Sequence, residues 1–383
     1  MKRKITVTTG TRAEYGILRP VIKAIKDSKK LELYLIVSGM HLSKKYGKTI
    51  EEIKNDGYKI SAIVDMTPKH DSTIHAAIGL GKGIISFSQI FEKIRPDINL
   101  VLGDRDEMLA SALAACHMNI PNAHIHGGDK SKGTIDEYNR HAITKISNIH
   151  FAATKKSAKR IIKMGENPKY VFLTGSPSID EVTSKKITNP EKLKKKFKLD
   201  LQGEDILLVH HPITSEPSKS EREITNILKA IVKLKKPTIA IAPNSDYGNE
   251  KILQVLYEFS KKNSFLSIYK SIPRSDYLGL LKNCGLIIGN SSSGIIEGSY
   301  FEIPVINIGI RQMNREIGKN VINLQNDSIQ SIEKAILKSL KRKKYRIFQK
   351  EKIYGNGNAS TKIVRILERI ILNKQLIQKQ ISY

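Results

Sequence analysis

The sequence predicts an α/β protein built from two doubly wound domains, each a mainly parallel sheet with helices on both faces. Short β-branched runs alternate with loops and helical stretches along most of the 383 residues, a pattern typical of parallel sheets. A polar, lysine-rich segment at residues 184–205 interrupts this alternation, which then starts again. The interruption divides the chain into two domains of ordinary size.

In the first domain, expected at residues 1–175, each predicted strand is followed by a loop and usually by a helical stretch. The predicted strands are residues 4–9, 31–37, 58–64, 98–102, 122–125 and 149–154. Helical stretches are expected at residues 17–25, 50–53, 108–118 and 155–165, from apolar spacing or from helix-forming composition.

The second domain, expected at residues 176–354, repeats the pattern. Its predicted strands are residues 206–209, 238–242, 265–269, 285–289 and 304–308. Residues 358–380 carry apolar side chains near three–four spacing, which predicts a helix. We assign it to a C-terminal segment, 355–383, that packs back on the first domain.

The composition is strongly basic: 65 Lys and Arg against 37 Asp and Glu give a net charge of +28. This favours either an anionic partner or a solvated lysine-rich surface. The charge is scattered over presumed helix faces, which favours the solvated surface. Trp is absent and aromatic residues are sparse, so no base-stacking surface for nucleic acid is expected.

Targeting and redox signals are few. Cys116 and Cys284 lie far apart in apolar surroundings and are typical of reduced core thiols. The apolar run after the basic start is too short for a signal peptide, and no uninterrupted apolar run has membrane-spanning length. We therefore expect a cytoplasmic protein that binds no membrane.

Unusual polar clusters follow nearly every predicted strand. In parallel α/β sheets, ligands bind beyond the carboxyl ends of the strands, so two domains with facing strand ends would make one polar cleft. The clusters are Arg12–Glu14, His41, Asp104–Asp106, His126–Asp129, His210–His211, Asn244–Asp246, Asn290–Ser293 and Arg311.

A metal site is one interpretation of His124 and His126, which would share a face of a strand. A zinc site needs a third ligand; candidate side chains for it exist, but the sequence contains no recognisable metal motif. His124 lies inside the predicted strand and is more typical of a structural histidine, whereas His126 is a better site candidate. No metal is expected.

An anion site is the interpretation that fits the segment after residue 289. Ser or Asn there would cap a helix starting near Gly294, whose free amides attract phosphate. Glu297 lies one turn later and can bind sugar hydroxyls, while Arg12 and Arg311 supply charge for a diphosphate. Neither G-x-x-x-x-G-K-[ST] nor G-x-G-x-x-G occurs, which disfavours an ATPase or a dinucleotide oxidoreductase.

Acid–base chemistry is the third interpretation, because proton transfer at carbon needs groups whose pKa a cleft can tune. Helix capping or pairing with a neighbouring arginine would explain some of these carboxylates equally well. The candidates are Asp104, His126, Asp136, Glu137 and His211.

Eight segments, in order and at matching spacing, resemble the hydrolysing UDP-N-acetylglucosamine 2-epimerases, most closely the branch that feeds sialic and other nonulosonic acids. They are TGTRAEYG, VSGMH, LGDRDE, HIHGGD, GTIDEYNRHAITK, HHPIT, GNSSSGIIE and PVINIGIRQ. The resemblance implies two Rossmann-like domains of the GT-B type and anti elimination of UDP to a 2-acetamidoglucal, which takes up water to give N-acetylmannosamine. It also implies a homodimer or homotetramer and no cofactor, neither nicotinamide nor metal; no nucleic-acid partner is expected.

The resemblance implies roles for individual positions. Asp104, Glu137 and His211 match catalytic residues, and Arg140 follows Glu137 in the pattern. His126 stands where part of the family has a glutamate, and is placed with the catalytic group. The substrate-binding group comprises Arg12, Asp129, Asp136, Arg140, Ser291, Ser292, Glu297 and Arg311 from the resemblance, with His41 and Asn244 from the clusters that follow predicted strands.

Other functions stay open at this point. The same reaction on a UDP- or GDP-linked 2,4-diacetamido-2,4,6-trideoxyglucose, as in legionaminic acid synthesis, is a close variant. A GT-B glycosyltransferase is an alternative of another class, and a basic nucleic-acid-binding protein is a third.

Overall fold

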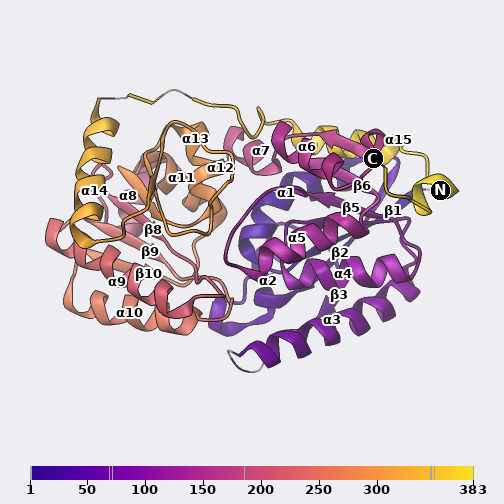
Figure 1. Cartoon of the computed structure of the whole chain (residues 1–383), viewed down its shortest axis with the longest axis horizontal. Helices are drawn as coiled ribbons and strands as arrows, with labels where there is room; N and C mark the ends of the chain where they lie inside the picture. The colour runs from indigo at the N-terminus through magenta and orange to yellow at the C-terminus, as the bar shows by residue number, and fades with distance from the viewer. Residues whose placement is uncertain are drawn as a thin grey trace. The chain divides into compact units, whose positions relative to one another are not determined.

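The computed structural model describes residues 2–68, 70, 72–184, 186–345, 347–348 and 350–382. The chain forms two compact units, which we describe one at a time (Figure 1). The first unit comprises residues 1–129, 136–183 and 354–383, and the second comprises residues 130–135 and 184–353.

The first unit is built on a parallel sheet with the order β3-β2-β1-β4-β5-β6-β7. Its strands are β1 (Arg3–Thr9), β2 (Leu31–Ser38), β3 (Ile60–Val64), β4 (Ile98–Leu102), β5 (Asn122–Ile125), β6 (Ile149–Ala152) and β7 (Val171–Leu173). The order reverses between β1 and β4, and at such a switch point the loops diverge and leave room for a ligand.

Helices cover both faces of this sheet, because alternate residues of each strand point to opposite sides. Leu35 and Val37 of β2 pack into one core cluster, whereas Ile36 packs into another. The helices are α1 (Arg12–Asp27), α2 (Ile50–Asn55), α3 (Thr73–Ile94), α4 (Asp106–His117), α5 (Ile135–Ile146), α6 (Lys155–Lys163), α7 (Pro177–Thr183), α15 (Ala359–Arg369) and α16 (Lys374–Ile377), with short 3₁₀ turns at Gly39–Leu42, Lys44–Tyr46 and Pro168–Tyr170. Helix α15 packs on α1 and α7 (Figure 1).

Helix α3 is long and apolar enough to cross a membrane by length and composition, with a mean hydropathy of 1.2 over its best window. One face packs on α4, where Gly79 and Gly83 let the helix lie against Met66: a Cβ at Gly79 would come within 2.6 Å of the Met66 carbonyl oxygen. Ile74, Ile78 and Ile85 are exposed.

The second unit has a parallel sheet with the order β10-β9-β8-β11-β12-β13. Its strands are β8 (Ile206–Val209), β9 (Thr238–Ile241), β10 (Leu266–Tyr269), β11 (Leu286–Gly289), β12 (Val305–Ile308) and β13 (Val321–Leu324). Its helices are α8 (Pro190–Phe197), α9 (Pro217–Leu234), α10 (Asn249–Lys262), α11 (Arg274–Asn283), α12 (Ser292–Ile296), α13 (Gly298–Phe301) and α14 (Ile329–Lys344). The switch point lies between β8 and β11.

The predicted fold class, two doubly wound domains with parallel sheets, is confirmed. The boundary expected after residue 175 precedes the division at residue 183, because α7 packs on α1 in the first unit. The C-terminal helix predicted at 358–380 is two helices, α15 and α16, separated at residues 370–373.

Candidate active site

A buried arginine organises the carboxylates of the first unit. Arg140, on α5, is 1% exposed and forms ion pairs with Asp104, which follows β4, and with Glu137 at 2.9 Å. Burial alone would lower the pKa of Arg140, but Asp104 and other nearby carboxylates outweigh it and raise the pKa. The Asp104 and Glu137 side chains stay about a quarter exposed, so both can meet a ligand.

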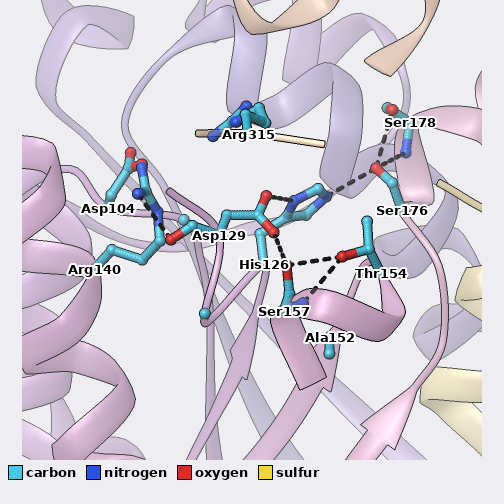
Figure 2. A network of polar contacts seen from close by, with 12 residues as sticks. Asp104, His126, Asp129, Arg140, Ala152, Thr154, Ser157, Ser176, Ser178 and Arg315 are labelled. Atoms are coloured by element: carbon cyan, nitrogen blue, oxygen red, sulfur yellow. Dashed lines mark hydrogen bonds and ion pairs between the residues drawn. The ribbon is translucent and has the colours of Figure 1, made fainter. Parts of the chain in front are cut away.

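His126 lies directly after β5 and is held at both ring nitrogens (Figure 2). Its Nδ1 lies 2.9 Å from Oδ2 of Asp129, and its Nε2 lies 2.8 Å from Oγ of Ser176. Ser176 Oγ also lies 3.0 Å from Ser178 Oγ. The backbone of His126 has φ +66°, so the chain turns sharply there and brings Asp129 back toward the ring.

Asp129 joins this histidine to the buried arginine (Figure 2). Its Oδ1 accepts a hydrogen bond of 2.7 Å from Ser157 Oγ, and its main-chain oxygen accepts one of 3.3 Å from Arg140 Nη1. Ser157 is fixed in turn by Thr154, the N-cap of α6. The sequence-predicted residues Asp104, His126, Asp129, Glu137 and Arg140 therefore form one contiguous network.

The other candidate residues of the first unit lie after other strands at the same edge of the sheet or stabilise the loops there. Arg12 begins α1 and forms an ion pair of 2.7 Å with Glu52. Asp136 is buried in the first turn of α5. His41 is fully buried between the hydroxyl groups of Thr9, at 3.0 Å, and Thr49, at 2.7 Å. Burial lowers the pKa of His41 to about 4, so a neutral ring supports the loop after β2.

His124 is a structural histidine. It is fully buried, with Nε2 at 2.7 Å from the Gly103 carbonyl oxygen, and burial lowers its pKa to about 3. Among the described residues, no group of three or more His, Cys, Asp or Glu side chains is placed to hold a metal ion.

A second pair of carboxyl groups in this unit was not predicted. Glu14 and Glu107 are both buried and both lie against Gly10, whose amide donates to Glu14 at 3.0 Å. Burial, followed by the repulsion of Glu107, raises the pKa of Glu14 to about 8. Glu14 and Glu107 both lie in segments that the sequence analysis selected. The sequence did not show that the two side chains pack against each other.

In the second unit, His211 follows β8 at the switch point. Asn290, which follows β11, bonds to both main-chain groups of His211, accepting from its amide at 2.7 Å and donating to its carbonyl oxygen at 2.8 Å. The main-chain amide of Asn244 donates to His211 Nδ1 at 3.2 Å. Because an amide can only donate, the neutral ring carries its proton on Nε2.

Ser291 is the N-cap of α12, and Ser292 is its first residue. The helix predicted to start near Gly294 thus starts two residues earlier. Glu297 is 2% exposed and forms an ion pair with Arg274, the first residue of α11. Sequence reasoning missed Arg274, although it follows strand β10 as closely as other selected residues follow their strands.

Asn244 and Arg311 follow β9 and β12 at the same edge of the second sheet. The main-chain oxygen of Arg311 accepts a hydrogen bond of 3.1 Å from the amide of Lys132. We call residues 130–135 the strap: they follow Asp129 in the chain but belong to the second unit. Gly133 accepts from the amide of Ser215 at 3.2 Å, and Ile135 donates to Thr214 Oγ1 at 3.2 Å.

Two parallel sheets, each with a switch point in its strand order, define the class: an α/β protein with two doubly wound domains. The family of UDP-N-acetylglucosamine 2-epimerases matches residues 23–368. This chain belongs to that family.

Curated relatives extend over the whole chain. A UDP-N,N'-diacetylbacillosamine 2-epimerase (hydrolyzing) of Legionella pneumophila is 36% identical over 100% of both chains. A GDP/UDP-N,N'-diacetylbacillosamine 2-epimerase (hydrolyzing) of Campylobacter jejuni is 35% identical over 89% of each. A UDP-N-acetylglucosamine 2-epimerase of Neisseria meningitidis is 33% identical over 96% of this chain and 95% of its own.

Solved structures of the family share the fold. The Neisseria meningitidis enzyme bound to UDP-GlcNAc superposes with a TM-score of 0.80 at 19% identity, covering 96% of this chain and 100% of that one. The Methanocaldococcus jannaschii enzyme in complex with UDP-GlcNAc and UDP gives 0.77 at 23% identity, covering 95% and 99%.

Proposed function

We propose that this protein is a hydrolysing 2-epimerase whose substrate is a UDP-linked 2,4-diacetamido-2,4,6-trideoxyglucose. The observation that carries the choice of sugar is the 36% identity, over the full length of both chains, to a relative named for UDP-N,N'-diacetylbacillosamine. The sequence-based expectation put UDP-N-acetylglucosamine first. It becomes the second candidate, favoured by the 33% identical Neisseria relative.

The reaction begins with loss of the nucleotide. The bond from C1 to the diphosphate oxygen breaks, and its electron pair leaves with UDP while a base takes the proton from C2, which gives a glycal. In this proposal Asp104 or Glu137 is the base, because both carboxylates are partly exposed. Arg140 holds them at a fixed spacing.

His211 acts on the leaving group. Since its Nδ1 accepts from a main-chain amide, its Nε2–H can donate to the departing diphosphate oxygen. Arg12 and Arg311 add positive charge, and Ser291, Ser292, Asn244 and Glu297 bind the nucleotide. The negative charge that develops on the departing diphosphate is stabilised by hydrogen-bond donors and cations that are already in place and need not reorganise.

The second step restores the sugar. Water adds its oxygen to C1, and a proton is delivered to C2 on the face opposite to the one from which the first was taken. The products are UDP and the free manno-configured sugar. Asp129 and Asp136 complete the sugar side in this proposal.

A substrate panel tests the choice of sugar and base. We expect kcat/KM for UDP-N,N'-diacetylbacillosamine to exceed that for UDP-N-acetylglucosamine by at least about 100-fold, a difference of roughly 3 kcal/mol in transition-state binding. Purified protein is assayed for UDP or GDP release from the UDP and GDP forms of both sugars. Equal or reversed kcat/KM values would move N-acetylglucosamine to first place, and turnover that requires an acceptor would indicate a glycosyltransferase.

A further inference from the structure

Neither ring nitrogen of His126 offers a lone pair to a substrate. A carboxylate only accepts hydrogen bonds, so the contact with Asp129 places the ring proton on Nδ1. Nε2 then accepts the hydroxyl proton of Ser176 at 2.8 Å. The His126 side chain is 9% exposed, against 24% for Asp104 and 26% for Glu137.

The hydrogen bonds from the His126 ring to Asp129 and Ser176 can form whether the ring is neutral or protonated. If His126 gains a proton, Nε2–H donates to Ser176 Oγ, and the Ser176 hydroxyl turns toward Ser178 Oγ, 3.0 Å away. Hydroxyl protons can rotate without movement of heavy atoms. Protonation of His126 therefore leaves Asp129 where it is.

His126 influences the candidate site through its contact with Asp129. Both carboxylate oxygens are tied, one to His126 and the other to Ser157, and this fixes the main-chain oxygen that binds Arg140 at 3.3 Å. Arg140 in turn holds Asp104 and Glu137. His126 thus reaches the two exposed carboxylates through Asp129 and Arg140.

We infer that His126 is a positioning residue and not the group that exchanges a proton with the sugar: clamped between Asp129 and Ser176, it fixes Arg140 and through it Asp104 and Glu137. This inference deepens the proposed function and rests on it for the identity of the reaction. It replaces the catalytic role that the sequence suggested for His126.

Two variants separate positioning from proton transfer. His126→Asn keeps a donor in the place of Nδ1, and asparagine tolerates the positive φ, but an amide takes up no proton. We expect His126→Asn to keep kcat within about 10-fold of wild type, with the pH dependence of kcat unchanged, whereas His126→Leu loses about 100-fold. Equal and deep loss in both variants, or loss of one limb of the pH profile in His126→Asn, overturns the inference.

A control variant and a folding check are needed to interpret the kcat values of these two variants. His117→Asn makes the same change at an exposed histidine, the last residue of α4, so it should change kcat by less than about 3-fold. Thermal unfolding of each variant is compared with wild type. If His126→Leu does not fold, His126→Asn still decides, because a proton-transfer role predicts deep loss in His126→Asn.

The tautomer gives a readout that needs no turnover. In ligand-free protein labelled with ¹⁵N-histidine, we expect the neutral form of the His126 ring to carry its proton on Nδ1, with Nε2 unprotonated and hydrogen-bonded. A proton on Nε2 with Nδ1 bare would overturn the clamp. Absence of turnover on every nucleotide sugar would contradict the proposed function. The tautomer of His126 would still test whether Asp129 and Ser176 hold the ring as inferred.

Discussion

Glu14 shows how burial changes the behaviour of a single residue. Its carboxyl group accepts from the Gly10 amide beside a second buried carboxyl, Glu107. A pKa raised to about 8 means that the folded protein binds a proton at Glu14 that the unfolded chain releases above about pH 4.5. Binding of this proton stabilises the folded protein fully below pH 4.5, and the stabilisation is lost as pH rises toward 8.

Glu14→Gln should therefore gain stability relative to wild type as pH rises. Glutamine keeps the acceptor for Gly10 and carries no charge. We expect the melting temperature of Glu14→Gln, minus that of wild type, to rise by about 5 °C between pH 5 and pH 8. Glu51→Gln, on an exposed side chain of α2, is the control and should show no such trend. A constant difference for Glu14→Gln would refute the raised pKa.

Arg274 and Glu297 form a buried ion pair in the second unit. Removing one partner leaves an uncompensated buried charge and costs roughly 3 kcal/mol, whereas removing both costs less. We expect Arg274→Met to lower the free energy of unfolding more than Arg274→Met combined with Glu297→Gln. Denaturant unfolding measures both, and a double variant less stable than the single one would speak against the pairing.

At the scale of elements, the strap links a loop of the first unit's sheet to the loops of the second. Gly133 has φ +75°, and a Cβ there would lie 2.8 Å from Ile213 Cγ2 and 2.9 Å from Ile310 Cδ1. Asp129 precedes the strap and Asp136 follows it. Both ends of the strap are therefore joined through the main chain to candidate site residues of the first unit.

Gly133→Ala tests this linkage against a matched control. Gly57 has φ +74° and open space around a Cβ, so Gly57→Ala pays only the backbone cost of about 1 kcal/mol. We expect Gly133→Ala to lower kcat about 10-fold or more, because small misplacements of reacting groups are costly. Gly57→Ala should leave kcat near wild type. Matching losses in both variants would show that backbone strain alone is responsible.

The elements were predictable where the sequence pattern was strong. Buried strands such as β4 and β11 are continuous apolar runs, typical of parallel sheets, and they were found. Strand β7 has three residues, none of them fully buried, and β13 is likewise half-exposed, so neither carries a clear pattern. Helix α3 was missed because Gly79, Gly81 and Gly83 weaken its helical propensity.

The sequence selected candidate residues but not their connections. In the structure Asp104 and His126 belong to one network, and His211 lies in the second unit. The rule that polar residues after parallel strands form a site selected all three as candidates. It did not reveal that Ser157 and Ser176, which follow other strands, hold the network together. Which polar groups pair depends on tertiary packing, and no local pattern reports it.

At the scale of the whole molecule, the two units share one strand order, which β7 extends in the first unit, and each has a polar candidate residue at its switch point, Asp104 after β4 and His211 after β8. In our account the first unit acts on the carbon atoms of the sugar, and the second binds the nucleotide. The net charge of +28 suits an anionic substrate, but its scatter over helix faces favours a solvated lysine-rich surface.

The most direct test of the central claim, that cleavage proceeds through loss of the C2 proton, is the reaction in D₂O followed by ¹H NMR. With UDP-N,N'-diacetylbacillosamine as substrate, the account predicts UDP and a free sugar of manno configuration that carries deuterium at C2. A free sugar that keeps both its gluco configuration and its C2 proton would contradict it, since simple hydrolysis at C1 would then explain the release of UDP.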